Sequence, residues 1–361
     1  IKLDVGNLEL ESVTATNTVD IQATGNVTGS KLQTGYHLEA ESIHIQSAGS
    51  INNLKTDTNR LDVDVEGNIE ITNNPAKEVN VRMNAQGQIK ATLGNVILEN
   101  MSTNGNIKLH VEDLVVTNNQ PYHLTANELT VSSNNRFGNN EYSVTMDVNT
   151  LNAQAKDLYF TNNVDKTLNS TYLLADNHLF GILGNGNFKE IKANDIYLQA
   201  KNISVDTIES MNLDLIAEDM NINYLNSDIA HLQGTKATIE TIKAKDTTIR
   251  VDNLTVKDIL SDKLDIEGKE VLVDTIRGEN TRIKAEHLKS QKVESTNLAI
   301  NGKDIEVGTV AGTTVGIDGT KAILETIKAK DTTIRVDNLT VKDILSDKLD
   351  IEGKEVLVDT I

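Results

Sequence analysis

Cysteine and tryptophan are absent from this 361-residue chain, and aromatic residues make up only 3% of it. Without cysteine, the chain can form neither disulfide bonds nor thiolate metal sites. The scarcity of aromatic rings argues against a polysaccharide-cleaving site, because such sites stack rings against sugars. No stretch approaches the about 20 apolar residues of a transmembrane helix. The net charge of −19 argues against nucleic acid and anionic membrane surfaces as partners.

The second half of the chain has a 17-residue period. Counting back from the last residue in steps of 17 meets only aliphatic residues, and a second aliphatic column runs from Ile203 to Val356 with the same period. A period of this size, without a helical pattern inside it, predicts a stack of short, similar coils. The first column consists of Ile191, Ile208, Leu225, Ile242, Ile259, Ile276, Val293, Val310, Ile327, Ile344 and Ile361.

Each coil contains three short strand patterns. In one coil, the apolar-x-apolar triplets start at Ile259, Leu264 and Val271, before Ile276 opens the next coil. Alternation over so few residues is typical of strands, because neighbouring side chains point to opposite faces. The sequence therefore predicts an all-β fold, a single-stranded, three-sided β-solenoid (parallel β-helix) that winds right-handed, with 17-residue coils from about 190 to 361.

One inward position is restricted to small residues. Two residues after the first column, every coil from Ala193 to Ser346 has alanine, serine or glycine. This predicts a tight corner where two faces converge. Three of these coils also place a threonine inward, Thr247, Thr281 or Thr332, where we expect each hydroxyl to bond a backbone partner.

Residues 234–276 and 319–361 are a near-exact duplication. They differ only because Thr238 and Ile239 become Ile323 and Leu324. The offset between the two copies equals five whole periods, so the duplication preserves the inward register. Tolerance of whole added coils favours a stalk whose length can change.

The first half keeps the strand pattern but lengthens its turns with asparagine, as at 73–74, 118–119, 134–135 and 162–163. Segments 113–119 and 157–163 resemble each other at a spacing of 44, which predicts looser coils of about 20–22 residues. We expect two regions of one solenoid: residues 1–185 with long Asn-rich turns, and residues 186–361 with regular coils.

The runs Leu38–Ile51 and Gly67–Asn74 resemble the β-helical shafts of filamentous haemagglutinin-type exoproteins. That family includes two-partner-secretion adhesins and the stalks of contact-dependent inhibition proteins. The resemblance covers most of residues 1–230 and lies in the strand pattern rather than in a specific motif. It implies a right-handed β-helix, export through the outer membrane, and a role in reaching other cells. The tight Lys/Asp-rich coils are more regular than is usual in the family.

Candidate chemistry is sparse. Asp62 and Asp64 point outward from one strand, but they lack the glycine-rich repeats of calcium-binding β-rolls. The histidines show no metal-ligand spacing, and we expect them all to face solvent from strands: His37, His44, His110, His123, His178, His231 and His287. No catalytic residue, cofactor or metal is predicted.

A lateral contact is the one surface feature that the sequence singles out. Outward aliphatic residues recur through the duplication, and on a stack of coils they suit bundling or docking of a partner. These residues are Leu260, Leu272, Ile323, Leu345 and Leu357.

The sequence favours a non-catalytic shaft segment of a large bacterial secreted or cell-surface adhesin, without cofactor. Its expected partners are cell-surface proteins or glycans, met through surface loops or further domains, and self-association is a further option. Because the sequence starts at Ile1 without methionine and stops at Ile361, a core position in the middle of a coil, we expect it to be part of a longer protein. One alternative is a filament or sheath subunit that polymerises end to end. Another is a polysaccharide-active β-helix enzyme, which a groove with three or more carboxylates would favour.

Overall fold

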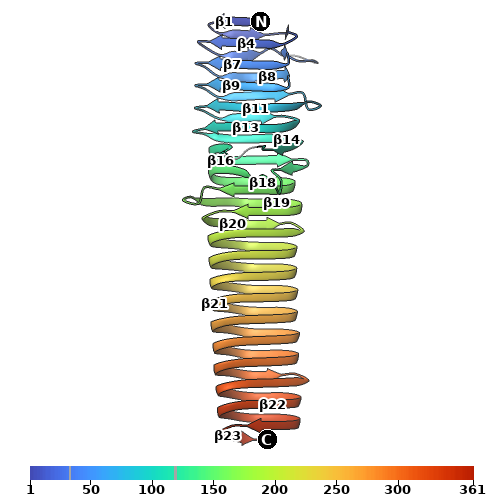
Figure 1. Cartoon of the computed structure of the whole chain (residues 1–361), viewed down its shortest axis with the longest axis vertical. Coiled ribbons are helices and arrows are strands. Elements are labelled where there is room, and N and C mark those ends of the chain that lie inside the picture. Colours follow the sequence, from blue (N-terminus) through green and yellow to red (C-terminus); the bar gives the residue numbers. More distant parts are fainter. Residues whose placement is uncertain (32–33, 118–119) are drawn as a thin grey trace. The chain divides into compact units, whose positions relative to one another are not determined.

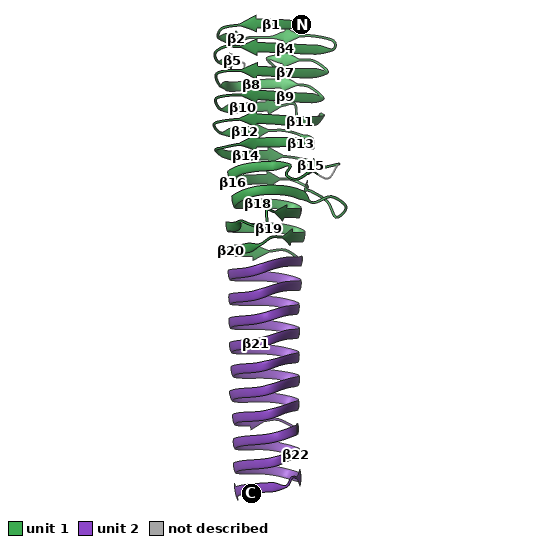
Figure 2. Cartoon of the chain, turned by 60° about the vertical axis from the view of Figure 1, so that its left-hand side comes forward, with its two compact units in different colours: residues 1–193 green, residues 194–361 purple. Residues whose placement is uncertain are grey.

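The computed structural model describes residues 1–31, 34–117 and 120–361, and within these ranges every element is a β-strand (Figure 1). The strands pair in parallel with their counterparts one coil away. The chain forms two compact units, residues 1–193 and 194–361 (Figure 2). Each unit is a β-solenoid, as predicted; its right-handed winding stays a prediction.

Among its described residues, unit 1 contains twenty strands. They are β1 (Lys2–Val5), β2 (Leu8–Leu10), β3 (Val13–Thr14), β4 (Thr18–Ala23), β5 (Val27–Gly29), β6 (Leu38–Glu39), β7 (Ser42–Ser47), β8 (Ile51–Asp57), β9 (Arg60–Val65), β10 (Ile69–Asn73), β11 (Glu78–Ala85), β12 (Ile89–Thr92), β13 (Asn95–Thr103), β14 (Asn106–Val111), β15 (Asp113–Val115), β16 (Leu124–Ser133), β17 (Arg136–Phe137), β18 (Val144–Asn162), β19 (Thr167–Ile182) and β20 (Asn185–Lys192).

Coil length varies within unit 1. The spacing of paired residues is shortest between Glu78 and Asn95, at 17, and longest between Val13 and Leu38, at 25. The coils therefore scatter around the predicted length instead of repeating it. The two coils that suggested that length do fit, since Leu114 pairs with Phe137 and Phe137 with Leu158, spacings of 23 and 21. Some extra residues lie inside strands, as where the pairing of β11 with β13 shifts between Val81 and Arg82 and skips Glu99.

Unit 2 keeps a constant 17-residue coil, as predicted. It consists of β21 (Asp195–Ala311), β22 (Thr314–Glu352) and β23 (Glu355–Thr360), and equivalent residues of successive coils pair, such as Asn297 with Thr314. The predicted separate short strands are instead continuous, because the hydrogen-bonded ladder runs through the corners. Residues 194–361 make about ten such coils.

The two aliphatic columns form the core of unit 2. The first is buried from Ile208 to Ile344, and the second from Ile203 to Leu339. Only the last members, Ile361 and Val356, are exposed. Burying a large aliphatic side chain stabilises by about 1.5–3 kcal/mol, so the stability of each coil depends on its neighbours covering it.

The tight corner is closed by serine hydroxyls. Ser261 Oγ donates to the carbonyl of Lys263 at 2.8 Å and meets Thr247 Oγ1 at 2.9 Å. Ser346 Oγ likewise lies 3.0 Å from Thr332 Oγ1. The inward threonines are therefore buried as predicted, but two of them bond a serine side chain rather than backbone. Thr281 Oγ1 is buried with no partner.

A glycine column marks one corner of unit 1. Side-chain oxygens there form hydrogen bonds between successive coils: Asn26 Oδ1 accepts the Ser50 N–H at 2.8 Å, and Ser50 Oγ accepts the Asn68 N–H at 3.0 Å. The glycine before each of these residues lies against the oxygen below it, and a β-carbon at Gly67 would be 2.2 Å from Ser50 Oγ. This column repeats Gly-Asn or a close variant.

The prediction that the Asn-Asn pairs form turns is confirmed only in part. Asn74 and Asn163 accept N–H bonds from residues two positions on, as turn residues do. Asn73 and Asn162 instead lie buried at strand ends, where Asn162 bonds both the N–H and the carbonyl of Val148 at 3.1 Å. The pair 134–135 is exposed in a bend, and 118–119 lies outside the described residues.

Candidate interaction surface

The five aliphatic residues predicted for a lateral contact are all exposed, with Leu272 and Ile323 each 41% exposed and Leu260 50%. They do not form one patch. Steps of 17 place Leu260 and Leu345 in one outward column, and Leu272, Ile323 and Leu357 in another. Besides Ile1, Val356 and Ile361 near the chain ends, three exposed large apolar residues were not predicted: Val164 in unit 1, and Met211 and Ile229 in unit 2. They belong to no repeated column.

Leu272 and Ile323 line a groove of about 770 Å³, here called the Leu272 groove, whereas Leu357 does not. Two neighbouring outward columns of unit 2 run through it, and their members between 253 and 323 line it. The Leu272 column consists of Thr238, Thr255, Leu272, Lys289, Glu306, Ile323, Thr340 and Leu357. The His287 column consists of Lys236, Asn253, Glu270, His287, Asp304, Lys321, Asn338 and Glu355.

One ion pair and two histidine–carboxylate contacts fill the middle of the Leu272 groove. Lys289 Nζ lies 2.7 Å from Glu306 Oε1. His287 Nδ1 lies 2.9 Å from Asp304 Oδ2, and its Nε2 lies 3.8 Å from Glu270 Oε1. Leu272 and Ile323 flank the Lys289–Glu306 pair, one coil away on each side. The groove is thus apolar at two points and charged between them.

A longer groove of about 1020 Å³ also runs along unit 2. Its floor is a column of small residues that includes Gly234, Gly268, Gly302 and Gly319. A β-carbon at Gly234 would lie 1.9 Å from the carbonyl oxygen of Ala217 in the coil below. A side chain at Gly234 would therefore require the backbone of the coil below to shift. We call this surface the glycine groove.

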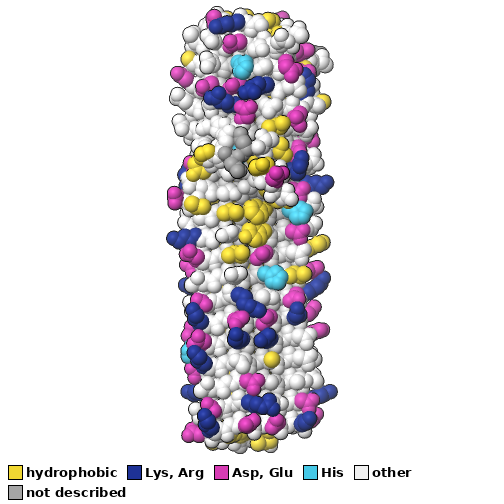
Figure 3. Space-filling model, viewed as in Figure 1, with side chains coloured by type: hydrophobic (Ala, Val, Ile, Leu, Met, Phe, Trp, Pro, Cys, Tyr) yellow, Lys and Arg dark blue, Asp and Glu magenta, His cyan; other side chains and the backbone are white. Residues whose placement is uncertain are grey.

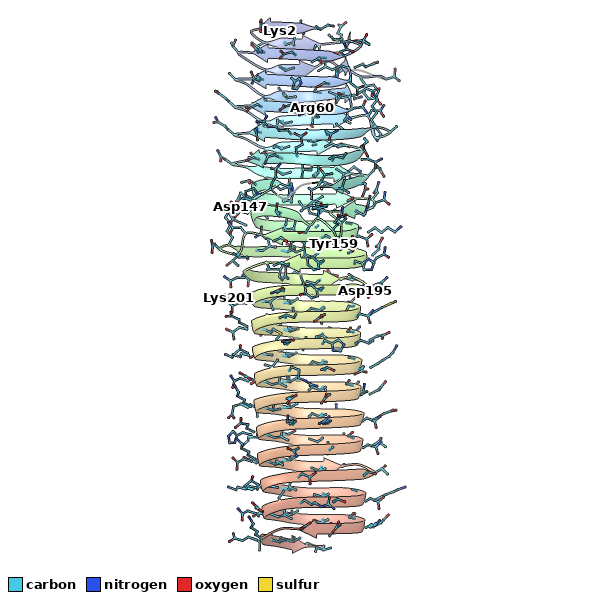
Figure 4. The ribbon with its side chains drawn as sticks, viewed as in Figure 1. Lys2, Arg60, Asp147, Tyr159, Asp195 and Lys201 are labelled. Atoms are coloured by element: carbon cyan, nitrogen blue, oxygen red, sulfur yellow. The ribbon has the colours of Figure 1, made fainter. Side chains whose placement is uncertain are left out.

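Two ladders of alternating charge border the glycine groove. On one side Glu267 lies 2.6 Å from Lys284, and on the other Lys269 lies 2.8 Å from Asp252. Lysine, arginine and acidic side chains are interspersed over the visible face of unit 2 (Figure 3), and side chains such as Lys201 project from the coils (Figure 4). Such ladders satisfy charge within the chain, although each exposed pair adds little stability.

These contacts shift acidic groups toward the charged form. The hydrogen bond and charge of Lys284 lower the pKa of Glu267, and those of Lys303 lower the pKa of Glu286. The hydrogen bond of Asp252 raises the pKa of Lys269. A general acid in glycoside hydrolysis needs a raised pKa, whereas the pKa values of Glu267 and Glu286 are lowered.

No family model, curated protein or solved structure matches this chain.

Within the described ranges, no group of three or more histidine or acidic side chains is placed to hold a metal ion. Asp62 Oδ2 lies 3.6 Å from His44 Nδ1 and 3.7 Å from Arg82 Nη1, so this carboxylate has side-chain partners within the chain. No helix of the described chain has the length and hydrophobicity to cross a membrane.

Two histidines contradict the expectation that all seven face solvent. His37 and His123 are buried, and the ring of each accepts a backbone N–H from the next coil in addition to the backbone pairing of the residue itself. His37 Nδ1 accepts the Lys55 N–H at 2.8 Å, which leaves Nε2 to donate to the Ser30 carbonyl at 2.9 Å. His123 Nδ1 lies 2.6 Å from Thr145 Oγ1. Both stabilise the coil connections of unit 1.

Proposed function

We propose that this chain is a non-catalytic spacer, a shaft segment of a large bacterial secreted or cell-surface adhesin. The observation that carries the proposal is the constant 17-residue coil of unit 2, together with a duplication of five whole coils. A protein selected for a site keeps a fixed geometry around that site. A protein selected for length tolerates added coils, provided that each one preserves the register.

The packing supports stiffness as well as length. Each coil pairs with its neighbours through a parallel ladder that continues across the corners, and its aliphatic columns are buried. Bending unit 2 would open one face and expose those columns. In this proposal, other cell-surface proteins or glycans are recognised by surface loops or further domains.

Label-to-label distance tests the spacer role. Lys201 and Lys354 occupy equivalent positions nine coils apart, and the chain has no cysteine, so Lys201→Cys and Lys354→Cys allow clean spin labelling. Double electron–electron resonance between the two spin labels should give a narrow distance distribution near about 43 Å. Deleting residues 234–318, five coils, should leave a folded protein with the distance reduced to about 19 Å.

Deletion of 234–310 is the matched control, because it removes a non-integral number of coils. It should broaden the distance distribution and lower the thermal stability. A broad distribution in the full chain, or equal damage from both deletions, would contradict the spacer role.

Surface location needs a separate experiment. Antibodies against this chain should label intact cells of its source without permeabilisation. Labelling that requires permeabilisation would contradict the cell-surface part of the proposal and leave the spacer measurement unaffected.

One observation favours the enzyme alternative. The glycine groove is lined by four carboxylates, those of Glu218, Asp252, Glu267 and Glu286. Three of them are paired with lysine, and no aromatic ring is among the lining residues, so the spacer remains the better supported function. Release of reducing ends from a panel of acidic and neutral polysaccharides, abolished by Glu267→Gln, would establish the alternative.

A further inference from the structure

We propose that the Leu272 groove binds the same groove of a second copy of this chain, with the two copies antiparallel. The proposal goes beyond the spacer role and does not depend on it. Its basis is the order of side chains in the two outward columns. When a column of one copy is aligned with the same column of a second copy read backwards, positive residues meet negative residues and apolar residues meet apolar residues.

The geometry of such a dimer is fixed by its symmetry. If a two-fold axis runs along the strand direction between two facing sheets, each outward column meets the same column of the partner, read backwards. We place the axis midway between the coils of Lys289 and Glu306. Each coil above the axis then faces the partner's coil at the same distance below it.

In the Leu272 column, this axis pairs opposite charges and apolar side chains. Lys289 faces the partner's Glu306, and Leu272 faces the partner's Ile323. Because Lys289 and Glu306 already lie 2.7 Å apart within one copy, two copies would form a closed square of alternating charges. The outer pairs of this column are uncharged: Thr255 with Thr340, and Thr238 with Leu357.

The His287 column shows the same pattern. His287 faces the partner's Asp304, and Glu270 faces the partner's Lys321. Further out, Asn253 faces the partner's Asn338, and Lys236 faces the partner's Glu355, a pair that repeats Lys321 and Glu270 through the duplication. All the charged residues in both columns therefore meet the opposite charge, or for His287 a carboxylate, across eight coils. Electrostatic complementarity of this kind fixes register and orientation.

The duplication adds to this pattern. Of the two residues that differ between the copies, only Ile323 points outward, in place of Thr238. Ile323 is the residue that faces the partner's Leu272. The change therefore provides each Leu272 with an apolar neighbour.

The next outward column limits the contact. There every charged pair is like-charged: Asp274 would face the partner's Glu325, Lys257 the partner's Lys342, and Glu240 the partner's Asp359. None of these residues lines the groove. The complementary strip is about 38 Å long and about 10 Å wide. This is about 400 Å² per copy, half of a standard interface, so we expect a weak dimer that depends on concentration and on salt.

Sedimentation of the full chain up to about 1 mM, at low salt, tests the proposal with a charge swap. Lys289→Glu alone and Glu306→Lys alone each create two like-charge contacts per dimer, and each should weaken association at least about tenfold. Mixed together, the two variants should associate again, because each facing pair of residues then carries opposite charges. A monomeric unmodified chain, or a mixture that fails to associate, would overturn the proposal.

Two controls separate this contact from general effects. Lys263→Glu breaks a comparable ladder pair, 3.0 Å from Asp246 and outside the groove, and should leave association unchanged. Leu260→Lys with Leu345→Lys alters exposed leucines of another column and should also have no effect. Loss of association in either control, with Leu272→Lys harmless, would place the contact elsewhere.

Orientation is tested by cysteine cross-linking. Facing sheets lie about 10 Å apart, which is too far for a direct disulfide but suits a short bis-maleimide linker. Leu272→Cys and Ile323→Cys should be joined by this linker only when the two variants are mixed, since the chain has no other cysteine. Cross-linking of Leu272→Cys with itself would indicate parallel copies and refute the antiparallel arrangement.

Discussion

Replacing Gly67 by alanine should destabilise unit 1, because the glycine column leaves no volume for a β-carbon. The added carbon would lie 2.2 Å from Ser50 Oγ and 2.7 Å from the Gly49 carbonyl oxygen. Ser50 can rotate away only by giving up its bond to the Asn68 N–H. The Gly49 carbonyl belongs to the backbone ladder and cannot move without disturbing the coil below.

The expected cost combines two effects. Loss of the Ser50 hydrogen bond contributes about 1 kcal/mol. Residual overlap with the carbonyl contributes about 1–3 kcal/mol. We therefore expect Gly67→Ala to lower the free energy of unfolding by about 2–4 kcal/mol, seen in urea denaturation followed by circular dichroism. Amide exchange should accelerate most in the coils around Asn68, because each coil contacts only its neighbours.

Gly6 provides the matched control. It occupies the same column, but a β-carbon there would meet nothing within 4 Å. Gly6→Ala should be neutral or stabilising by up to about 1 kcal/mol, through the unfolded state. If both variants unfold at the same urea concentration, steric closure of the corner does not explain the glycine column.

Two further predictions concern unit 2. Thr281→Val should be neutral or stabilising, because the buried Thr281 hydroxyl has no hydrogen-bond partner. Thr247→Val should lower the free energy of unfolding by about 1–3 kcal/mol, because it leaves the buried Ser261 hydroxyl without one of its partners. Equal effects of the two variants in thermal unfolding would argue against this difference. The pKa of Glu267 is lowered by Lys284, so its stabilising contribution is present above its ordinary pKa of 4.5 and is lost as pH falls through the lower, folded value. Below pH 4.5 the stability of the unmodified chain should therefore fall more steeply than that of Glu267→Gln, and parallel curves from urea titrations at each pH would contradict that assignment.

The regular part of the fold was accessible from sequence because the core repeats. The spacing of columns such as Ile208 to Ile344 equals the coil length, and the structure places these residues inward. Unit 1 was harder, because its coil length varies and no single period emerges. The Gly-Asn column, with Gly25, Gly49 and Gly67 at uneven spacing, was the available signal there, and it depends on contacts between coils.

The surface was predictable only in part. Exposure of Leu272 and Ile323 follows from strand alternation, and the structure agrees. The Leu272 groove and its charged pairs depend on which residues stack at a spacing of 17, so they emerge only once the columns are aligned side by side. The burial of His37 could not be foreseen, because it results from an irregular connection rather than from a strand pattern.

The near-identity of 234–276 and 319–361 affects how unit 2 reaches its native state. During folding, the later block can stack where the earlier one belongs, and only two side chains distinguish the alternatives. The misplaced form leaves residues 234–318 looped out, at an entropic cost of only a few kcal/mol. Growth of the stack in order from residue 194 avoids this kinetic trap, because the first block is already seated before its copy arrives.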